Sequence, residues 1–123
     1  MSAELLNRAT EFTVRIRKVC AVIDKMPGSV KVDSWQMMKS GSSIGANITE
    51  GDGSQTEPDF LTKYSIALKE VRETLYWLDV IIRAEILPPE RVPDLYDECN
   101  ELVAILTAIC KTIKGKRKPP NQS

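Results

Sequence analysis

Three breaks rich in glycine and proline constrain the fold of this chain more than any other feature. The breaks read MPGS (26–29), GDGSQTEP (51–58) and ILPPERVP (86–93). Each segment between them carries apolar residues at three- and four-residue spacing, which is the period of one helix face. No stretch of comparable length shows the alternation of a β-strand. The sequence therefore predicts an all-α chain of four helices.

The helix ranges follow from where this periodicity starts and stops. They are expected at about 3–25, 33–50, 57–86 and 90–114. Thr56 is a good N-cap for the third helix, with Asp59 at capping-box spacing, and Gly115 is placed to end the fourth. Short connections favour an antiparallel, up-down-up-down four-helix bundle over residues 1–114. The basic, proline-bearing segment 115–123 should be a disordered tail.

Length and composition indicate one globular domain. The chain has 123 residues, of which 42% are hydrophobic and 28% charged, as is ordinary for a soluble domain. Its first ten residues contain Glu4 and lack the apolar stretch of a secretory signal. No run approaches the roughly 18 apolar residues that a membrane span needs. We therefore expect a cytoplasmic protein with no membrane partner.

The residue types present disfavour catalysis. Histidine is absent, which removes the most frequent general base and metal ligand. Cys20, Cys99 and Cys110 fall on the apolar stripes of helices, so buried free thiols are expected. The acidic second loop does not match the ligand spacing of an EF-hand. We expect no enzymatic activity, no cofactor and no metal site.

The segment SGSSIGANITEG (40–51) combines small residues with helical spacing. It lacks the Lys-Ser/Thr of a phosphate-binding loop and does not follow a strand. We interpret it as the C-terminal half of the second helix. There, Gly41, Gly45 and Ala46 are expected to let neighbouring helices approach closely, by small-residue packing.

Four residues of this segment are predicted to form a structural motif. Asn47 lies one turn after Ser43 and is expected to hydrogen-bond a neighbouring helix or loop, because an unpaired half-buried amide is costly. Glu50 is expected to fasten the following loop. Gly51 is expected to end the helix in the left-handed conformation.

The third helix is apolar on two sides. Leu68, Leu75, Leu78 and Ile82 point one way, and Ile66, Trp77 and Val80 point roughly the opposite way. A monomeric bundle covers only one of these sides. The second side predicts an oligomer interface of Ile66, Trp77 and Val80, with a second copy of the chain as partner.

Charge is balanced overall but segregated along the chain. The net charge is +3 over residues 1–49, −8 over 50–101 and +5 over 102–123. The acidic middle disfavours a broad nucleic-acid groove there. The alternative to a purely protein partner is weak, sequence-independent contact with RNA or DNA. Its candidate residues are Arg15, Arg17, Lys18, Lys114, Lys116, Arg117 and Lys118.

The block SSIGANITEG, followed by YSIALKEVRETLYWLDV, resembles a family of small four-helix bundle proteins. That family was first noticed as open reading frames in intervening sequences of bacterial 23S ribosomal RNA genes. The matching positions are Ser43, Ile44, Asn47, Ile48, Glu50, Gly51, Phe60, Ala67, Leu68 and Glu73. The likeness covers nearly the whole chain in the order and length of its helices.

The resemblance implies an antiparallel bundle that forms a ring-like homopentamer and has no enzymatic activity. It also implies a possible nucleic-acid role, like that suspected of the family from its genomic setting. A distant likeness to an accessory protein of diversity-generating reverse transcriptases points the same way. This chain departs from the family where the often basic loop reads GDGSQTEPD, with Asp52 in place of a common aromatic. We therefore expect a non-catalytic, homo-oligomeric scaffold, with the nucleic-acid accessory as the alternative.

Overall fold

The structure, a computed structural model, describes residues 2–88, 90 and 92–117. In these ranges it contains four helices and no strand, which confirms the all-α prediction. The helices are α1 (Ser2–Ile23), α2 (Val30–Asp52), α3 (Glu57–Arg83) and α4 (Pro93–Arg117). Their bounds differ from the predicted ones by up to three residues.

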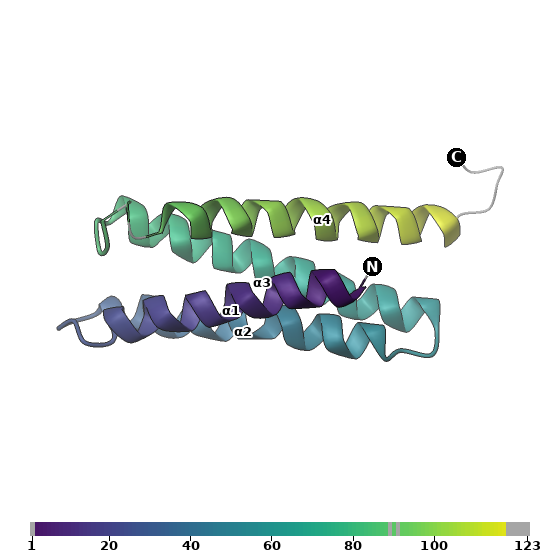
Figure 1. Ribbon diagram of the computed structural model, residues 1–123, viewed down its shortest axis with the longest axis horizontal. Helices are drawn as coiled ribbons and strands as arrows, with labels where there is room; N and C mark the ends of the chain where they lie inside the picture. The colour runs from purple at the N-terminus through teal and green to yellow at the C-terminus, as the bar shows by residue number, and fades with distance from the viewer. Residues whose placement is uncertain (1, 89, 91, 118–123) are drawn as a thin grey trace.

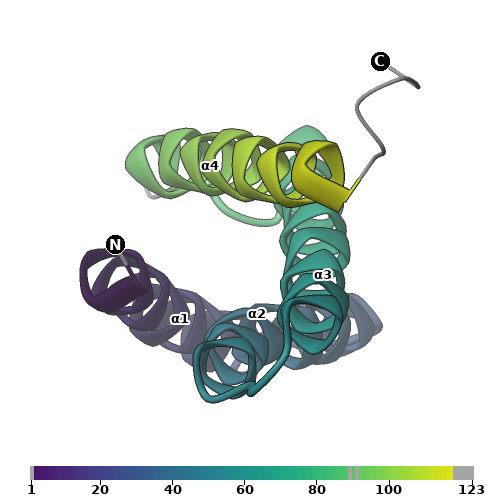
Figure 2. The ribbon, with the colours of Figure 1, turned by 90° about the vertical axis from the view of Figure 1, so that its right-hand side faces the viewer.

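Consecutive helices lie side by side and run in opposite directions (Figure 1). Thr13 Oγ1 of α1 donates to the carbonyl of Gly41 in α2 at 2.9 Å. Further along α1, Cys20 exchanges two hydrogen bonds of 3.4 Å with Ser34, which comes earlier in α2. Seen from one end, the helices follow one another around the bundle, with α1 and α4 at its two edges (Figure 2).

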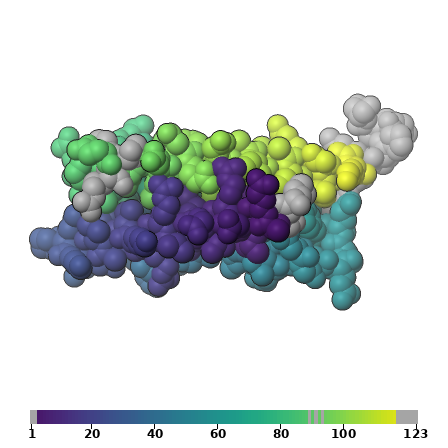
Figure 3. Space-filling view, viewed as in Figure 1, coloured from purple at the N-terminus to yellow at the C-terminus, as the bar shows by residue number. Residues whose placement is uncertain are grey.

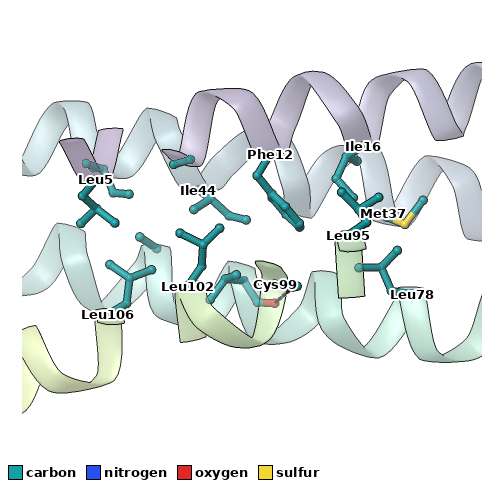
Figure 4. Packing of buried hydrophobic residues seen from close by; sticks show 14 of the residues in the cluster. Leu5, Phe12, Ile16, Met37, Ile44, Leu78, Leu95, Cys99, Leu102 and Leu106 are labelled. Carbon is teal, nitrogen blue, oxygen red and sulfur yellow. Dashed lines mark hydrogen bonds between the residues drawn. The ribbon is translucent and has the colours of Figure 1, made fainter. Parts of the chain in front are cut away.

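The core receives apolar side chains from all four helices. Figure 4 shows Phe12, Met37, Leu78 and Leu102, one from each helix, directed into the same interior. Each of the four is at most 1% exposed. Burying a side chain of this size stabilises the fold by about 1.5–3 kcal/mol, so the apolar stripes are what hold the helices together.

A pair of buried hydroxyl groups joins α2 to α3 inside the core. The oxygens of Ser40 and Thr74 are 2.7 Å apart, and both residues are at most 1% exposed. Each hydroxyl also reaches a carbonyl of its own helix, Ser40 that of Met37 at 3.2 Å and Thr74 that of Glu70 at 2.9 Å. A shift of one helix along the other would therefore lose the bond between the two hydroxyls, about 0.5–1.5 kcal/mol, and keep both intrahelical bonds.

Gly51 lets α2 and α3 approach closely near the loop that joins them. A Cβ atom at this position would lie 2.7 and 2.8 Å from two ring carbons of Tyr64. The Tyr64 hydroxyl donates to Asp52 at 2.5 Å, and its ring stacks on Phe60 with centroids 4.1 Å apart. The prediction that Gly51 ends the helix in the left-handed conformation is wrong. The helix continues through Asp52, and Gly28 is the glycine with a positive φ among the described residues.

The other small residues of this segment differ in their surroundings. A Cβ atom on Gly41 would lie 3.0 Å from Cγ2 of Ile16, so α1 and α2 do approach closely there. A Cβ atom on Gly45 would have nothing within 4 Å, and Ala46 is exposed. The prediction of close packing is therefore right for Gly41 and wrong for Gly45 and Ala46, which line a shallow hollow beside α1.

The two ends of α3 have well-defined caps. Its N-cap is Thr56 as predicted, and the Thr56 hydroxyl accepts from the Asp59 amide at 3.3 Å. Its C-terminal end comes earlier than predicted, because Glu85 adopts a left-handed φ of 57°. The Ile86 amide then bonds back to the carbonyl of Ile81 at 3.0 Å, which closes the last turn.

The remaining helix ends correct the prediction in two places. Gly115 does not end α4, which continues to Arg117. A glycine in a helix costs only about 1 kcal/mol, so it need not stop one. α2 begins at Val30, earlier than predicted, because Val30 packs against the core. The part of the predicted tail after Arg117 lies outside the described residues.

All three cysteines are free and buried, as the sequence predicts. Burial raises the pKa of the Cys99 thiol to about 12 and raises the pKa of Cys20 above its ordinary value. Cys99 also donates to the carbonyl of Val71 at 3.5 Å. Because the thiolate is the reactive form of cysteine, these side chains are suited to packing and not to chemistry.

We predict that Gly51→Ala destabilises the bundle. The new methyl group would overlap the Tyr64 ring, and such overpacking costs about 1–3 kcal/mol. The matched control is Gly45→Ala, which has free space and should gain about 0.5–1 kcal/mol of helix propensity. Urea unfolding followed by circular dichroism measures both. Equal stability of the two variants would show that the contact at Gly51 does not limit the packing.

We also predict that no thiol of the folded protein reacts quickly with Ellman's reagent at pH 8. With a pKa of about 12, Cys99 is ionised in roughly one molecule in ten thousand, against about a quarter for an ordinary thiol. In urea, all three cysteines should react at once. A stoichiometric fast phase in the native protein would contradict this.

Candidate interaction surfaces

The motif residues Ser43 and Asn47 are half-buried on α2. The Asn47 side-chain amide donates to the carbonyl of Ser43 at 2.8 Å, one turn earlier in the same helix. The prediction that Asn47 bonds a neighbouring helix or loop is therefore wrong. Within a helix, the carbonyl four residues earlier is within reach of an asparagine side-chain amide, and this local acceptor competes with more distant ones.

The other motif residues join α2 to α3. The Glu50 carboxylate forms an ion pair of 3.0 Å with Lys63, while its backbone carbonyl accepts from Ser54 in the loop at 3.1 Å. The two charged side chains are 58% and 36% exposed, so the ion pair contributes at most about 1 kcal/mol. Together with the contact between Gly51 and Tyr64, these bonds give the motif a structural role.

The second apolar side of α3 is partly open. Ile66, Trp77 and Val80 are each half-buried. Trp77 packs against the core, whereas Ile66 and Val80 lie outside the core cluster. The Trp77 indole nitrogen is buried and has no acceptor in the described part of the chain. The Tyr76 ring meets the Trp77 ring edge-on, with centroids 5.0 Å apart.

Among the described residues, four large apolar side chains are exposed, and none of them belongs to the interface predicted from the sequence. They are Trp35 (60% exposed), Tyr76 (59%), Val32 (58%) and Val14 (42%). The exposure of Trp35 could have been predicted from its position in the sequence. The residue falls off the apolar stripe of α2, and a lysine lies four residues away on either side, at Lys31 and Lys39.

The candidate nucleic-acid residues form two separate groups. The exposed ones are Arg15, Arg17, Lys18, Lys114 and Lys116, while the Arg117 side chain and Lys118 lie outside the described part. α1 begins and α4 ends at the same end of the molecule (Figure 1). Residues 15–18 lie about 20 Å along α1 from that end, at 1.5 Å per residue. The structure therefore does not bring the two groups together into one surface.

The helices α1 and α4 are held together by an ion pair near a shallow groove. Arg8 donates two hydrogen bonds to the Glu98 carboxylate, at 2.7 and 3.0 Å. This contact raises the pKa of the Arg8 guanidinium, and the nearby carboxylates of Glu101 and Glu4 act in the same direction. Three carboxylates around one guanidinium give this site a net charge of −2.

The groove itself, called the α1–α4 groove below, has a volume of about 360 Å³. Its lining residues are Glu4, Leu5, Arg8, Ile105, Ala108 and Ile109. Figure 3 shows the face on which α1 and α4 lie side by side. The lining is mostly apolar and carries no nucleophile or general base, so it is a surface for contact and not for reaction.

Within residues 2–88, 90 and 92–117, no three His, Cys, Asp or Glu side chains gather where they could hold a metal ion. In the same ranges, no helix is long and apolar enough to cross a membrane.

Comparisons with known proteins agree with this fold. Among solved structures, the chain is similar to a protein with unknown function from the S23 ribosomal protein family of Bacteroides thetaiotaomicron. The two are 35% identical and superpose with a TM-score of 0.80, over 89% of this chain and 97% of that one. No curated protein matches the chain. A family model described as "23S rRNA-intervening sequence protein" matches residues 1–108. The chain therefore belongs to the family of 23S rRNA-intervening sequence proteins.

Proposed function

We propose that this chain is a non-catalytic interaction or scaffold protein of the cytoplasm. In this proposal, the antiparallel, up-down-up-down bundle assembles into a homo-oligomer, a ring-like pentamer. The observation that carries it is the partly open apolar side of α3, where Ile66 and Val80 lie outside the core. The proposed number of five subunits comes from the resemblance to the four-helix bundle family.

Further support comes from the exposed aromatic residues. Trp35 and Tyr76 each leave about three-fifths of their surface to solvent. Tryptophan and tyrosine are enriched at protein interfaces, where their burial contributes strongly to binding. A surface with several such side chains gains free energy when another protein covers it.

The chemistry of the described residues supports a role without catalysis. The thiols are buried, and the pKa values of Cys20 and Cys99 are raised, so neither is an activated nucleophile. The chain has no histidine that could activate a serine. The apolar lining of the α1–α4 groove also suits packing better than proton transfer.

We predict that Val80→Glu breaks the oligomer without unfolding the chain. Val80 is half-buried and outside the core, so a charge there should prevent association and leave the fold within about 0.5 kcal/mol. Light scattering coupled to size exclusion measures the mass. The control is Val14→Glu, which adds the same charge to an exposed valine of α1. A wild-type chain that is monomeric at high micromolar concentration would refute the proposed assembly.

Trp77 gives a less clean test than Val80. Because Trp77 packs against the core, Trp77→Glu should lower thermal stability as well as association. Its effect on mass therefore has to be measured below the melting temperature of the variant.

The alternative function is binding of RNA or DNA. The observation in its favour is that Arg15, Arg17 and Lys18 are all exposed on α1, as are Lys114 and Lys116 near the end of α4. Exposed cations release counterions from a phosphate backbone, and this gives affinity without sequence preference. The acidic middle of the chain restricts such contact to these two groups.

If α1 binds single-stranded RNA, replacing Arg15, Arg17 and Lys18 by alanine should weaken the binding and its salt dependence. The slope of log affinity against log salt should fall by about 2, at roughly 0.7 per phosphate contact. Fluorescence anisotropy of a labelled oligonucleotide measures this. The control replaces the exposed α3 cations Lys69, Arg72 and Arg83. Equal effects of the two triple variants would indicate non-specific attraction only.

A further inference from the structure

We propose that the α1–α4 groove of one copy receives an apolar surface of α2 from a second copy, so that copies associate head to tail. This surface, called the Trp35 surface, consists of Val32 and Trp35 with Lys31 and Lys39 beside them. The inference rests on the proposed self-association and adds a second contact to the one assigned to the α3 side of Ile66 and Val80.

The first step is that the groove has apolar walls open to water. Leu5 is nearly buried at its base, while Ile105 and Ile109 are half-buried and Ala108 is exposed. Its volume of about 360 Å³ is within the range of sites that bury a ligand group, roughly 300–1,000 Å³. An apolar side chain seated there would exclude water from these walls.

The second step is that the Trp35 surface has the matching shape and polarity. Trp35 is the most exposed of the large apolar side chains described, and Val32, one turn before it, is 58% exposed. Lys31 and Lys39 are exposed one turn to either side of Trp35. The result is an apolar projection from α2 that lies between two cations.

Neighbouring charges reduce this positive character only in part. Asp33 lies between Val32 and Trp35 in the sequence, is half-buried and carries the opposite charge. Lys31 and Lys39 together outweigh it, so the surface keeps a net charge of +1.

The third step is charge complementarity. The Arg8 site at the groove has a net charge of −2 from Glu4, Glu98 and Glu101. The lysines of the Trp35 surface would lie near these carboxylates once Trp35 enters the groove. Complementary charges of this kind speed encounter and select the partner surface.

The same charges disfavour symmetric pairing. Two Trp35 surfaces face to face would bring Lys31 and Lys39 against their own copies, and two grooves would bring their carboxylates together. Like charges in contact cost several kcal/mol. Pairing of unlike surfaces avoids this cost, so the favoured contact is heterologous.

The positions of the two surfaces also suit head-to-tail association. In Figure 2, the edge helices α1 and α4 flank the open side of the bundle, and α2 lies on a different side. One copy can therefore offer its Trp35 surface and its groove at the same time. Repeated heterologous contacts close into rings or extend into open chains.

A mixing experiment tests this inference. Trp35→Glu removes the apolar projection and keeps the groove, whereas Ala108→Arg fills the groove and adds a cation that repels the lysines. Each variant alone should have a lower mass than the wild-type oligomer. Mixed in equal amounts, they should reach a higher mass than either variant alone, because each supplies the surface that the other lacks. Size exclusion with light scattering measures the masses.

The outcomes separate this inference from the proposed function. If the wild type forms an oligomer and either variant keeps its full mass, or the mixture gains no mass over the separate variants, the head-to-tail contact is refuted while self-association stands. If the wild type is a monomer, the proposed function itself fails. The control Ala21→Arg changes an exposed alanine of α1 outside the groove and should assemble normally.

Charge reversal gives a second, independent test. Replacing Lys31 and Lys39 by glutamate should raise the dissociation constant about tenfold or more, and so should replacing Glu4 and Glu101 by lysine. Combining all four changes in one chain should restore association. All four positions are exposed, so folding should be preserved. Failure of the combined variant to recover would overturn the assignment of these charges to one contact.

Discussion

The close contact between α2 and α3 is the constraint on which the rest of the structure depends. It exists because position 51 carries no side chain, so the Tyr64 ring can lie against the backbone of α2. The buried hydroxyls of Ser40 and Thr74, 2.7 Å apart, join the same two helices at a second place. With both contacts in place, the apolar stripes of α2 and α3 form a fixed platform for the two remaining helices.

The outer helices are attached to this platform more than to each other. α1 approaches α2 closely at Gly41, and α4 reaches α3 through Cys99 and Val71. Between α1 and α4, by contrast, the ion pair of Arg8 and Glu98 lies at a groove with apolar walls. The bundle is therefore closed on one side and open on the other, which gives it different surfaces on different sides.

Spacing along the chain predicts the helices and most of the core, because burial of residues such as Met37 follows from helical period alone. It cannot tell Gly51 from Gly45, since their surroundings depend on which helix lies opposite: a ring at 2.7 Å in one case and open space in the other. The bond of Asn47 could have been predicted, because its acceptor is one turn away in the same helix. The groove could not, because it depends on how two distant helices converge.

The net charge of the chain is zero, but its positive and negative charges lie in different segments. Charges separated by more than about 8–10 Å are largely screened at physiological salt, whereas α3, with its 27 residues, is about 40 Å long. Positive and negative regions of one copy therefore act independently on what approaches them. A long polyanion meets the acidic middle of the chain as well as its basic groups, but a second copy can match both. Segregated charge on a neutral helical bundle thus supports the proposed self-association over the nucleic-acid alternative.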